Sequence, residues 1–161
     1  MAKVGNKKKI TIGWQEIISL PQLNIPAIEV KIDTGAKTSS LHAENIQFFN
    51  KNGKEYIIFD VHPIQKHKEV IIRCEAPLVE KRDVKSSSGC QENRPMIKTN
   101  LKIGDYVFEI DLNLTKRDYM KSRMLLGRDA MKGNIIIDPE HKYLYGKLSD
   151  SEIELKYKNR K

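Results

Sequence analysis

The segment Lys31-Ile32-Asp33-Thr34-Gly35-Ala36 places a carboxylate, a hydroxyl and a glycine where an alternating apolar run ends. A carboxylate at the end of a strand is held in a fixed position, which acid–base catalysis requires. Gly35 lets another backbone or a carboxylate approach closely, because glycine has no Cβ. Asp33 is therefore the candidate catalytic residue, with Thr34, Gly35 and Ala36 as its supporting loop.

Carboxylates that hydrolyse a peptide bond work as a pair. Two of them about 3 Å apart cannot both ionise, so one is the base that activates a water and the other is the acid. Further Asp-Thr/Ser-Gly motifs are missing, since none begins at Asp60, Asp83, Asp111, Asp129 or Asp138. We therefore expect a homodimer in which a second Asp33 completes the pair and Thr34 bonds across the two-fold axis.

A second motif lies far along the chain. Met124-Leu125-Leu126-Gly127-Arg128-Asp129 places three apolar residues before a glycine and an arginine. This pattern predicts a buried strand turned by Gly127, with a short helix near Asp129–Lys132. An ordinary core strand with a glycine turn is the alternative interpretation.

The elements that would position both motifs are strands. Apolar and polar residues alternate over 26–32, directly before Asp33, and Asn52-Gly53 is typical of a tight hairpin. Further strands are expected at 55–62 and 68–75, and strands at 96–103 and 106–114 are expected to form a hairpin across Gly104-Asp105. Residues 135–137 are expected to pair with 143–145. The predicted fold is an all-β closed barrel with one short helix.

Several segments carry a family resemblance, and they occur in this order: Ile12–Glu16, Leu20–Leu23, Lys31–Ala43, Arg94–Ile97, Leu114–Met120 and Met124–Arg128. Together they resemble a bacterial family of retropepsin-like proteins formerly labelled ATP-dependent zinc proteases. The resemblance covers residues 10–147. It implies an acid-protease barrel, an aspartic-type peptidase activity carried by Asp33, and a peptide or protein substrate.

The resemblance also implies roles for other residues. Leu126, Gly127 and Arg128 would pack behind the Asp33 loop. Residues between the two motifs would form a flap over the substrate, and an ordinary surface loop is the alternative. The flap and substrate-binding candidates are Ser86, Ser87, Ser88, Gly89, Arg82 and Arg94. Some family members are associated with an ATP-grasp ligase that adds glutamates to a ribosomal protein, so the expected substrate class includes acidic, glutamate-rich tails.

The residues do not support the zinc and ATP of the old label. Zinc hydrolases cluster their ligands in motifs such as HExxH, and His42, His62, His67 and His141 show no such spacing. The sequence also has no Gly-rich loop ending in GK[ST]. No metal and no cofactor are therefore expected.

The net charge of +8 is concentrated near the two ends of the chain. Residues 1–9 and 156–161 hold eight lysines and arginines and no acid, and removing these eight from the 29 Lys+Arg leaves 21, equal to the 21 Asp+Glu. We expect a single domain at 10–150 between a flexible basic tail at 1–9 and a basic tail at 151–161. No apolar run is long enough for a membrane span, and a cytoplasmic protein is expected.

Two other functions remain open. A non-catalytic domain of the same fold would bind acidic peptides through arginine forks, for which Arg82, Arg94, Arg117 and Arg128 are the candidates. A ribosome- or RNA-associated factor would make weak nucleic-acid contacts through its basic tails.

Overall fold

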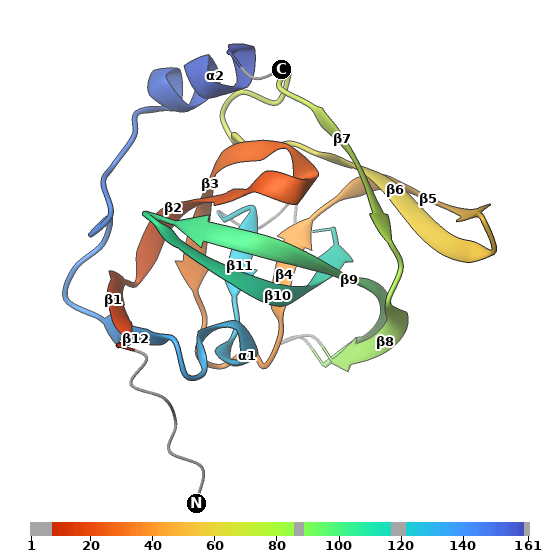
Figure 1. Cartoon of the computed structure of the whole chain (residues 1–161), viewed down its shortest axis with the longest axis horizontal. Helices are drawn as coiled ribbons and strands as arrows, with labels where there is room; N and C mark the ends of the chain where they lie inside the picture. The colour runs from red at the N-terminus through yellow and green to blue at the C-terminus, as the bar shows by residue number, and fades with distance from the viewer. Residues whose placement is uncertain (1–7, 86–88, 117–121, 160–161) are drawn as a thin grey trace, which may run out of the picture.

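The centre of the molecule is a mixed sheet that closes into a ring (Figure 1). The computed structural model describes residues 8–85, 89–116 and 122–159. Around the ring the strands follow the order β10, β4, β11, β3, β2 and β9, and β9 pairs back with β10. Their bounds are Gln15–Leu20 for β2, Ile25–Ile32 for β3, Ser39–His42 for β4, Gln91–Ile103 for β9, Tyr106–Thr115 for β10 and Met124–Leu126 for β11. The predicted closed, mostly-β barrel is confirmed.

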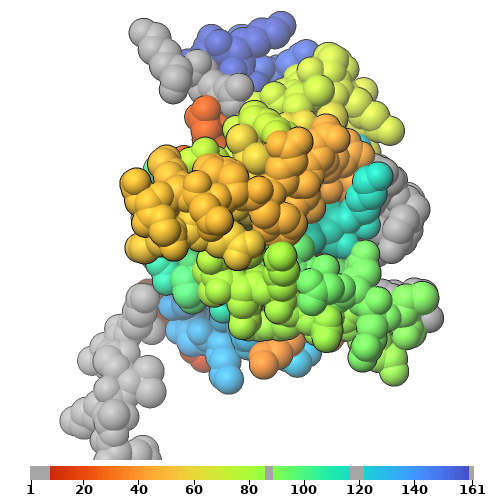
Figure 2. Space-filling model, turned by 90° about the vertical axis from the view of Figure 1, so that its right-hand side faces the viewer, coloured from red at the N-terminus to blue at the C-terminus, as the bar shows by residue number. Residues whose placement is uncertain are grey.

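The remaining elements surround this ring. A three-stranded antiparallel sheet contains β5 (Glu44–Lys51), β6 (Lys54–Val61) and β7 (Ile72–Pro77). Strand β8 (Glu80–Lys85) extends the main sheet beside β9, and β1 (Ile10–Gly13) pairs in parallel with β12 (Ile135–Asp138). Viewed from the side in Figure 2, the orange and yellow β5–β6 hairpin lies above the green atoms of β8 and β9.

Burial of branched apolar side chains holds the ring together. Ile28 and Val30 of β3 are completely buried, as are Leu41 of β4 and Leu112 of β10. Ile57 and Phe59 of β6 belong to the same hydrophobic cluster, so the three-stranded sheet shares one core with the ring. Burying each such side chain contributes about 1.5–3 kcal/mol.

Two predicted hairpins are confirmed. Asn52 and Gly53 both have positive φ, 53° and 80°, and join β5 to β6 as a type I′ turn requires. Strands β9 and β10 pair across Gly104-Asp105, where Gly104 has a φ of 57°.

The expected pairing of residues 135–137 with 143–145 is wrong. Strand β12 pairs with β1 instead, and the N–H of Tyr143 donates to Gln15 O at 2.8 Å. The N–H groups of Leu144 and Tyr145 donate to the buried carboxylate of Glu16 at 2.9 and 3.2 Å. Because β2 residues take these donors, the segment cannot use them for a hairpin.

The structure also corrects the expectation of one short helix. Besides η1 (Pro21–Leu23) and α1 (Arg128–Met131), it contains α2 (Asp150–Lys158), within the segment expected to be a basic tail. A capping box between Ser149 and Glu152 begins α2, and Ile153 and Tyr157 are buried against the core. Among the described residues, no helix is long and apolar enough to cross a membrane.

Candidate active site

Asp33 lies directly after β3, where three strands meet. Strand β11 runs between β3, to which it is parallel, and β4, to which it is antiparallel. Leu126 pairs with Ile32, and the Asp33 N–H continues this pairing by donating to Leu126 O at 2.9 Å. The backbone of Asp33 is thereby fixed to the central strands.

The loop that follows curls back on the Asp33 side chain. The Gly35 N–H donates to Asp33 Oδ1 at 3.0 Å, and the Ala36 N–H donates to the Asp33 carbonyl at 3.2 Å. A Cβ on Gly35 would lie only 3.2 Å from Asp33 Oδ1. The glycine therefore lets the backbone approach the carboxylate and orient it.

Helix α1 holds the outer side of this loop. The Arg128 and Asp129 N–H groups donate to the carbonyls of Ala36 and Lys37 at 2.8 and 2.9 Å. The Arg128 guanidinium donates to Thr34 O at 2.9 Å. Arg128 therefore acts as a structural clamp on the loop, and its charge is directed at a backbone carbonyl.

Gly127 is the point of closest approach between the two motifs. A Cβ there would lie 2.6 Å from Thr38 C and 2.9 Å from Lys37 O. The Gly127 N–H donates to Ser39 Oγ at 3.0 Å. Ser39 is a site residue that the sequence did not single out, because its hydroxyl lies in a Thr-Ser-Ser run with no distinguishing pattern.

The structure supplies one half of a carboxylate pair. Asp33 is partly exposed, and Thr34 and Gly35 beside it are exposed. Within the described part of the chain, the Asp33 carboxylate accepts the Gly35 N–H and forms no ion pair or hydrogen bond with another acid. A second carboxylate must therefore approach from outside this set of residues if the chain is to use a shared-proton mechanism.

Two of the flap and substrate-binding candidates lie on paired strands, Arg82 on β8 and Arg94 on β9. The two strands pair along the whole length of β8, and the end of β8 lies in the lower half of the view in Figure 1, where α1 also lies. Ser86, Ser87 and Ser88 fall outside the described residues. Gly89 is exposed and has a φ of 87°.

The candidate arginines are engaged within the chain. Arg82 and Arg94 lie directly opposite each other on β8 and β9. Arg82 pairs with Glu80, and Arg94 pairs with Glu92 at 2.8 Å. Arg117 lies outside the described residues. Arg82, Arg94 and Arg128 therefore each bind a group of this chain, and they do not form a joint carboxylate-binding face in the described structure.

A histidine–glutamate cluster lies at the end of β4, and no motif in the sequence indicates it. Glu44 Oε2 lies 2.9 Å from His62 Nε2, and Glu44 Oε1 lies 3.6 Å from His42 Nε2. His42 is almost completely buried. The cluster joins β4 and β5 to the loop after β6, which is a structural role.

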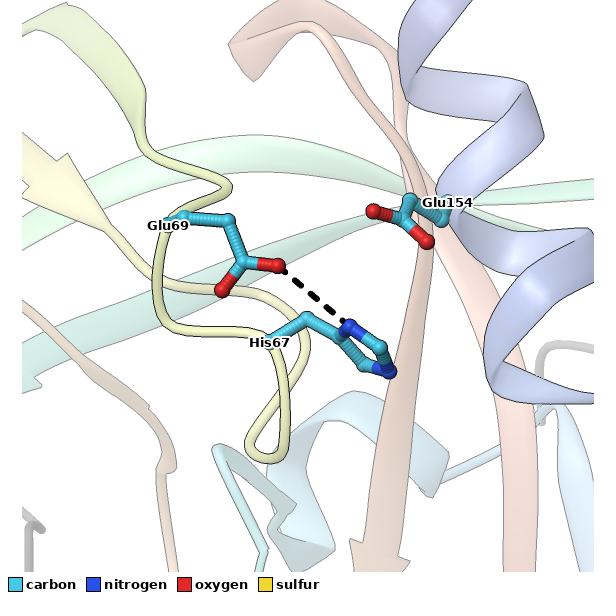
Figure 3. Close-up of side chains that lie close together, drawn as sticks. All are labelled: His67, Glu69 and Glu154. Carbon is cyan, nitrogen blue, oxygen red and sulfur yellow. Dashed lines mark ion pairs between the residues drawn. The ribbon is translucent and has the colours of Figure 1, made fainter.

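Residues of the types that bind metal ions also lie together in two groups, away from Asp33. His67 and Glu69 come from the loop before β7, Glu154 comes from α2, and Figure 3 shows the three side chains facing one space. His67 Nδ1 and Glu69 Oε1 are 3.4 Å apart, and Glu69 is 68% exposed. A second group lies on residues 138–141. Neither group contains Asp33, so neither would place a metal at the candidate carboxylate.

Comparisons with known proteins agree with this geometry. The model of the RimB-like family, described as the retropepsin-like aspartic endopeptidase RimB, matches residues 11–147. A crystal structure of a Legionella pneumophila protein of unknown function matches with a TM-score of 0.72 and 34% identity, over 86% of this chain and 99% of that one.

Curated relatives are longer. A probable alpha-L-glutamate ligase of Desulfotalea psychrophila is 46% identical over 150 residues, which are 93% of this chain and 32% of the relative. A probable alpha-L-glutamate ligase of Parasynechococcus marenigrum is 45% identical over the same shares. The chain therefore spans about one third of the length of the curated relatives it matches.

Proposed function

The chain belongs to the RimB-like family of retropepsin-like aspartic endopeptidases, and from this premise we propose that it hydrolyses peptide or isopeptide-like bonds with a water activated between two Asp33 carboxylates. The observation that carries the proposal is the position of Asp33. Its backbone is bonded to β11, its side chain is oriented by Gly35, and its loop is held by α1.

The reaction follows from two carboxylates that share one proton. The ionised carboxylate removes a proton from the water, whose oxygen attacks the scissile carbonyl carbon. The protonated carboxyl polarises that carbonyl and then donates its proton to the leaving nitrogen. The Gly35 N–H on Oδ1 keeps each carboxylate in place, so little reorganisation is needed as charge moves.

A homodimer supplies the second Asp33 in this proposal. Thr34 is exposed, so its hydroxyl can reach a second chain across a two-fold axis. A symmetric contact at this loop would bring two Asp33 side chains together, because each copy presents the same surface.

Glutamate-rich protein tails are the proposed substrate class. The relatives that contain a matching segment are named probable alpha-L-glutamate ligases. Hydrolysis breaks the bonds between glutamates that a ligase forms, so a peptidase of this kind would shorten what a ligase extends.

The test is cleavage of a peptide carrying a C-terminal run of glutamates, followed by mass spectrometry. Asp33→Asn should reduce the rate at least 1,000-fold, because the pair loses its base, whereas the exposed turn variant Asp105→Asn should retain full activity. A chelator should leave the rate unchanged. Activity that survives Asp33→Asn, or that a chelator removes, would refute the proposal.

A further inference from the structure

A cavity of about 270 Å³ lies where the ring closes between β2 and β9. These two strands pair only through Ser19 and Lys102, so the sheet opens beside that pair. Ile17, Pro26 and Leu148 contribute apolar lining. The cavity is thus a break in the barrel wall, bordered by two strands and the segment that leads into α2.

One wall of the cavity is formed by a glycine and an aromatic pair. Gly104 lines it, and a Cβ at this position would lie 2.8 Å from the ring of Tyr145. Tyr145 in turn packs edge-on against Tyr106, with ring centroids 6.5 Å apart. The aromatic pair and the glycine therefore pack together on this side of the opening.

Two lysines line the cavity from separate elements. Lys102 comes from β9 and Lys156 from α2, and both are exposed. Neither forms an ion pair or a side-chain hydrogen bond with another residue in the described ranges. Helix α2 is itself fixed by the buried side chains of Ile153 and Tyr157. Two lysines that line one cavity from separate elements give it positive charge, which favours an anionic ligand there.

We propose that this cavity is an exosite that binds glutamate side chains of the substrate tail while the tail's scissile bond lies at Asp33. The inference rests on the proposed function, which supplies an acidic substrate. The two ammonium groups would bind carboxylates, and the apolar lining would contact the methylene groups of the glutamates.

The spacing along the sheet fits an extended tail. Strand β2 carries the cavity at Ser19 and reaches the neighbour of the catalytic loop at Gln15, which pairs with Lys31. Asp33 lies two residues beyond Lys31, so six residues of strand separate the two places, which is roughly 20 Å at about 3.3 Å per residue. A tail of several glutamates can therefore span both places at once, whereas a tail of one or two cannot. The exosite favours long tails over short ones.

The experiment measures binding and cleavage separately. Fluorescein-labelled peptides that end in eight glutamates, two glutamates or eight glutamines are titrated against the full-length Asp33→Asn chain, which does not consume them. The variants are Lys102→Glu/Lys156→Glu and the milder Lys102→Gln/Lys156→Gln. The matched control is Lys54→Glu/Lys66→Glu, which changes two exposed lysines outside the cavity by the same charge.

We expect the eight-glutamate peptide to bind at least tenfold more weakly to the Lys→Glu pair, a few-fold more weakly to the Lys→Gln pair, and nearly unchanged to the control pair. In chains that keep Asp33, the Lys102→Glu/Lys156→Glu substitutions should raise KM for the eight-glutamate tail and leave kcat constant. Equal binding by both double variants and the control, equal binding of the glutamine peptide, or stronger lysine-dependent binding of oligouridine would overturn the exosite. Lysine-dependent binding without any cleavage would instead refute the proposed function and leave the exosite standing.

Discussion

Gly127 allows the close backbone approach on which the geometry of the candidate site depends. Its missing side chain lets β11 and α1 approach the segment after the Asp33 loop, and its N–H binds Ser39 Oγ. Asp33 itself needs this support, because its own contacts within the described chain are few. The position of the candidate carboxylate therefore depends on residues of the second motif as well as on Gly35.

Gly127→Ala tests this dependence. The new Cβ would lie 2.6 Å from Thr38 C, so the loop must shift, and overpacking of this kind costs about 1–3 kcal/mol. We expect a lower free energy of unfolding in urea. We also expect a lower kcat, because a shifted loop moves the Asp33 carboxylate. The comparison is Gly133→Ala, where a Cβ would meet nothing within 4 Å but φ is 83°. That variant should lose about 1 kcal/mol through backbone conformation alone and keep its kcat. Equal kcat in the two variants would contradict the positioning role.

At the scale of elements, the segment after β12 is held by one buried acid. Glu16 lies inside β2 and is completely buried. Its carboxylate accepts the N–H groups of Gly13 at 2.7 Å, Leu144 at 2.9 Å and Tyr145 at 3.2 Å. Three backbone donors on one carboxylate compensate for its burial and tie β1, β2 and residues 144–145 together.

Glu16→Gln should therefore be strongly destabilising. The amide replaces one acceptor oxygen with a donor that faces backbone N–H groups, which costs about 1–3 kcal/mol for each buried group left unsatisfied. Thermal unfolding followed by circular dichroism would measure it. The exposed Glu140→Gln should change the midpoint by no more than a degree or two, so an equal effect of the two substitutions would count against this assignment.

Prediction from the sequence succeeded where the signal is local and failed where a distant residue decides the structure, as Glu16 does. Alternation located β3, and local turn chemistry located the hairpins at Asn52-Gly53 and Gly104-Asp105, because both signals act between neighbours in sequence. The pairing expected for residues 143–145 depended on a partner far away in the chain, so local pattern favoured the wrong one. Helix α2 is also stabilised by tertiary burial, at Ile153 and Tyr157, within a segment whose charge suggested a tail.

The residues of the candidate site also differ in whether a local sequence signal identifies them. Asp33, Gly35 and Gly127 were identifiable because a carboxylate or a glycine in a short motif has a specific physical use. Ser39 and the two lysines that line the cavity were not, because hydroxyls and lysines are common on surfaces and only the fold reveals their neighbours.

For the whole molecule, the central issue is that one chain presents one candidate carboxylate. Mixing subunits tests whether two chains share a site. At constant wild-type concentration, a tenfold excess of Asp33→Asn chain should lower the rate about tenfold, because mass action moves most wild-type chains into mixed dimers. Sedimentation of the same samples would verify dimer formation. An unchanged rate would mean that each chain acts independently, and an equal mass of serum albumin serves as the inert control.

The narrow closure between β2 and β9 has a kinetic consequence. Ser19 and Lys102 are far apart in sequence, so their pairing carries a large loop-closure entropy and few compensating contacts. We infer that this seam forms after the β9–β10 hairpin and opens first in the native state. Amide protons along it would then exchange faster than those of β3, and weakening the seam would accelerate unfolding while leaving the folding rate nearly constant.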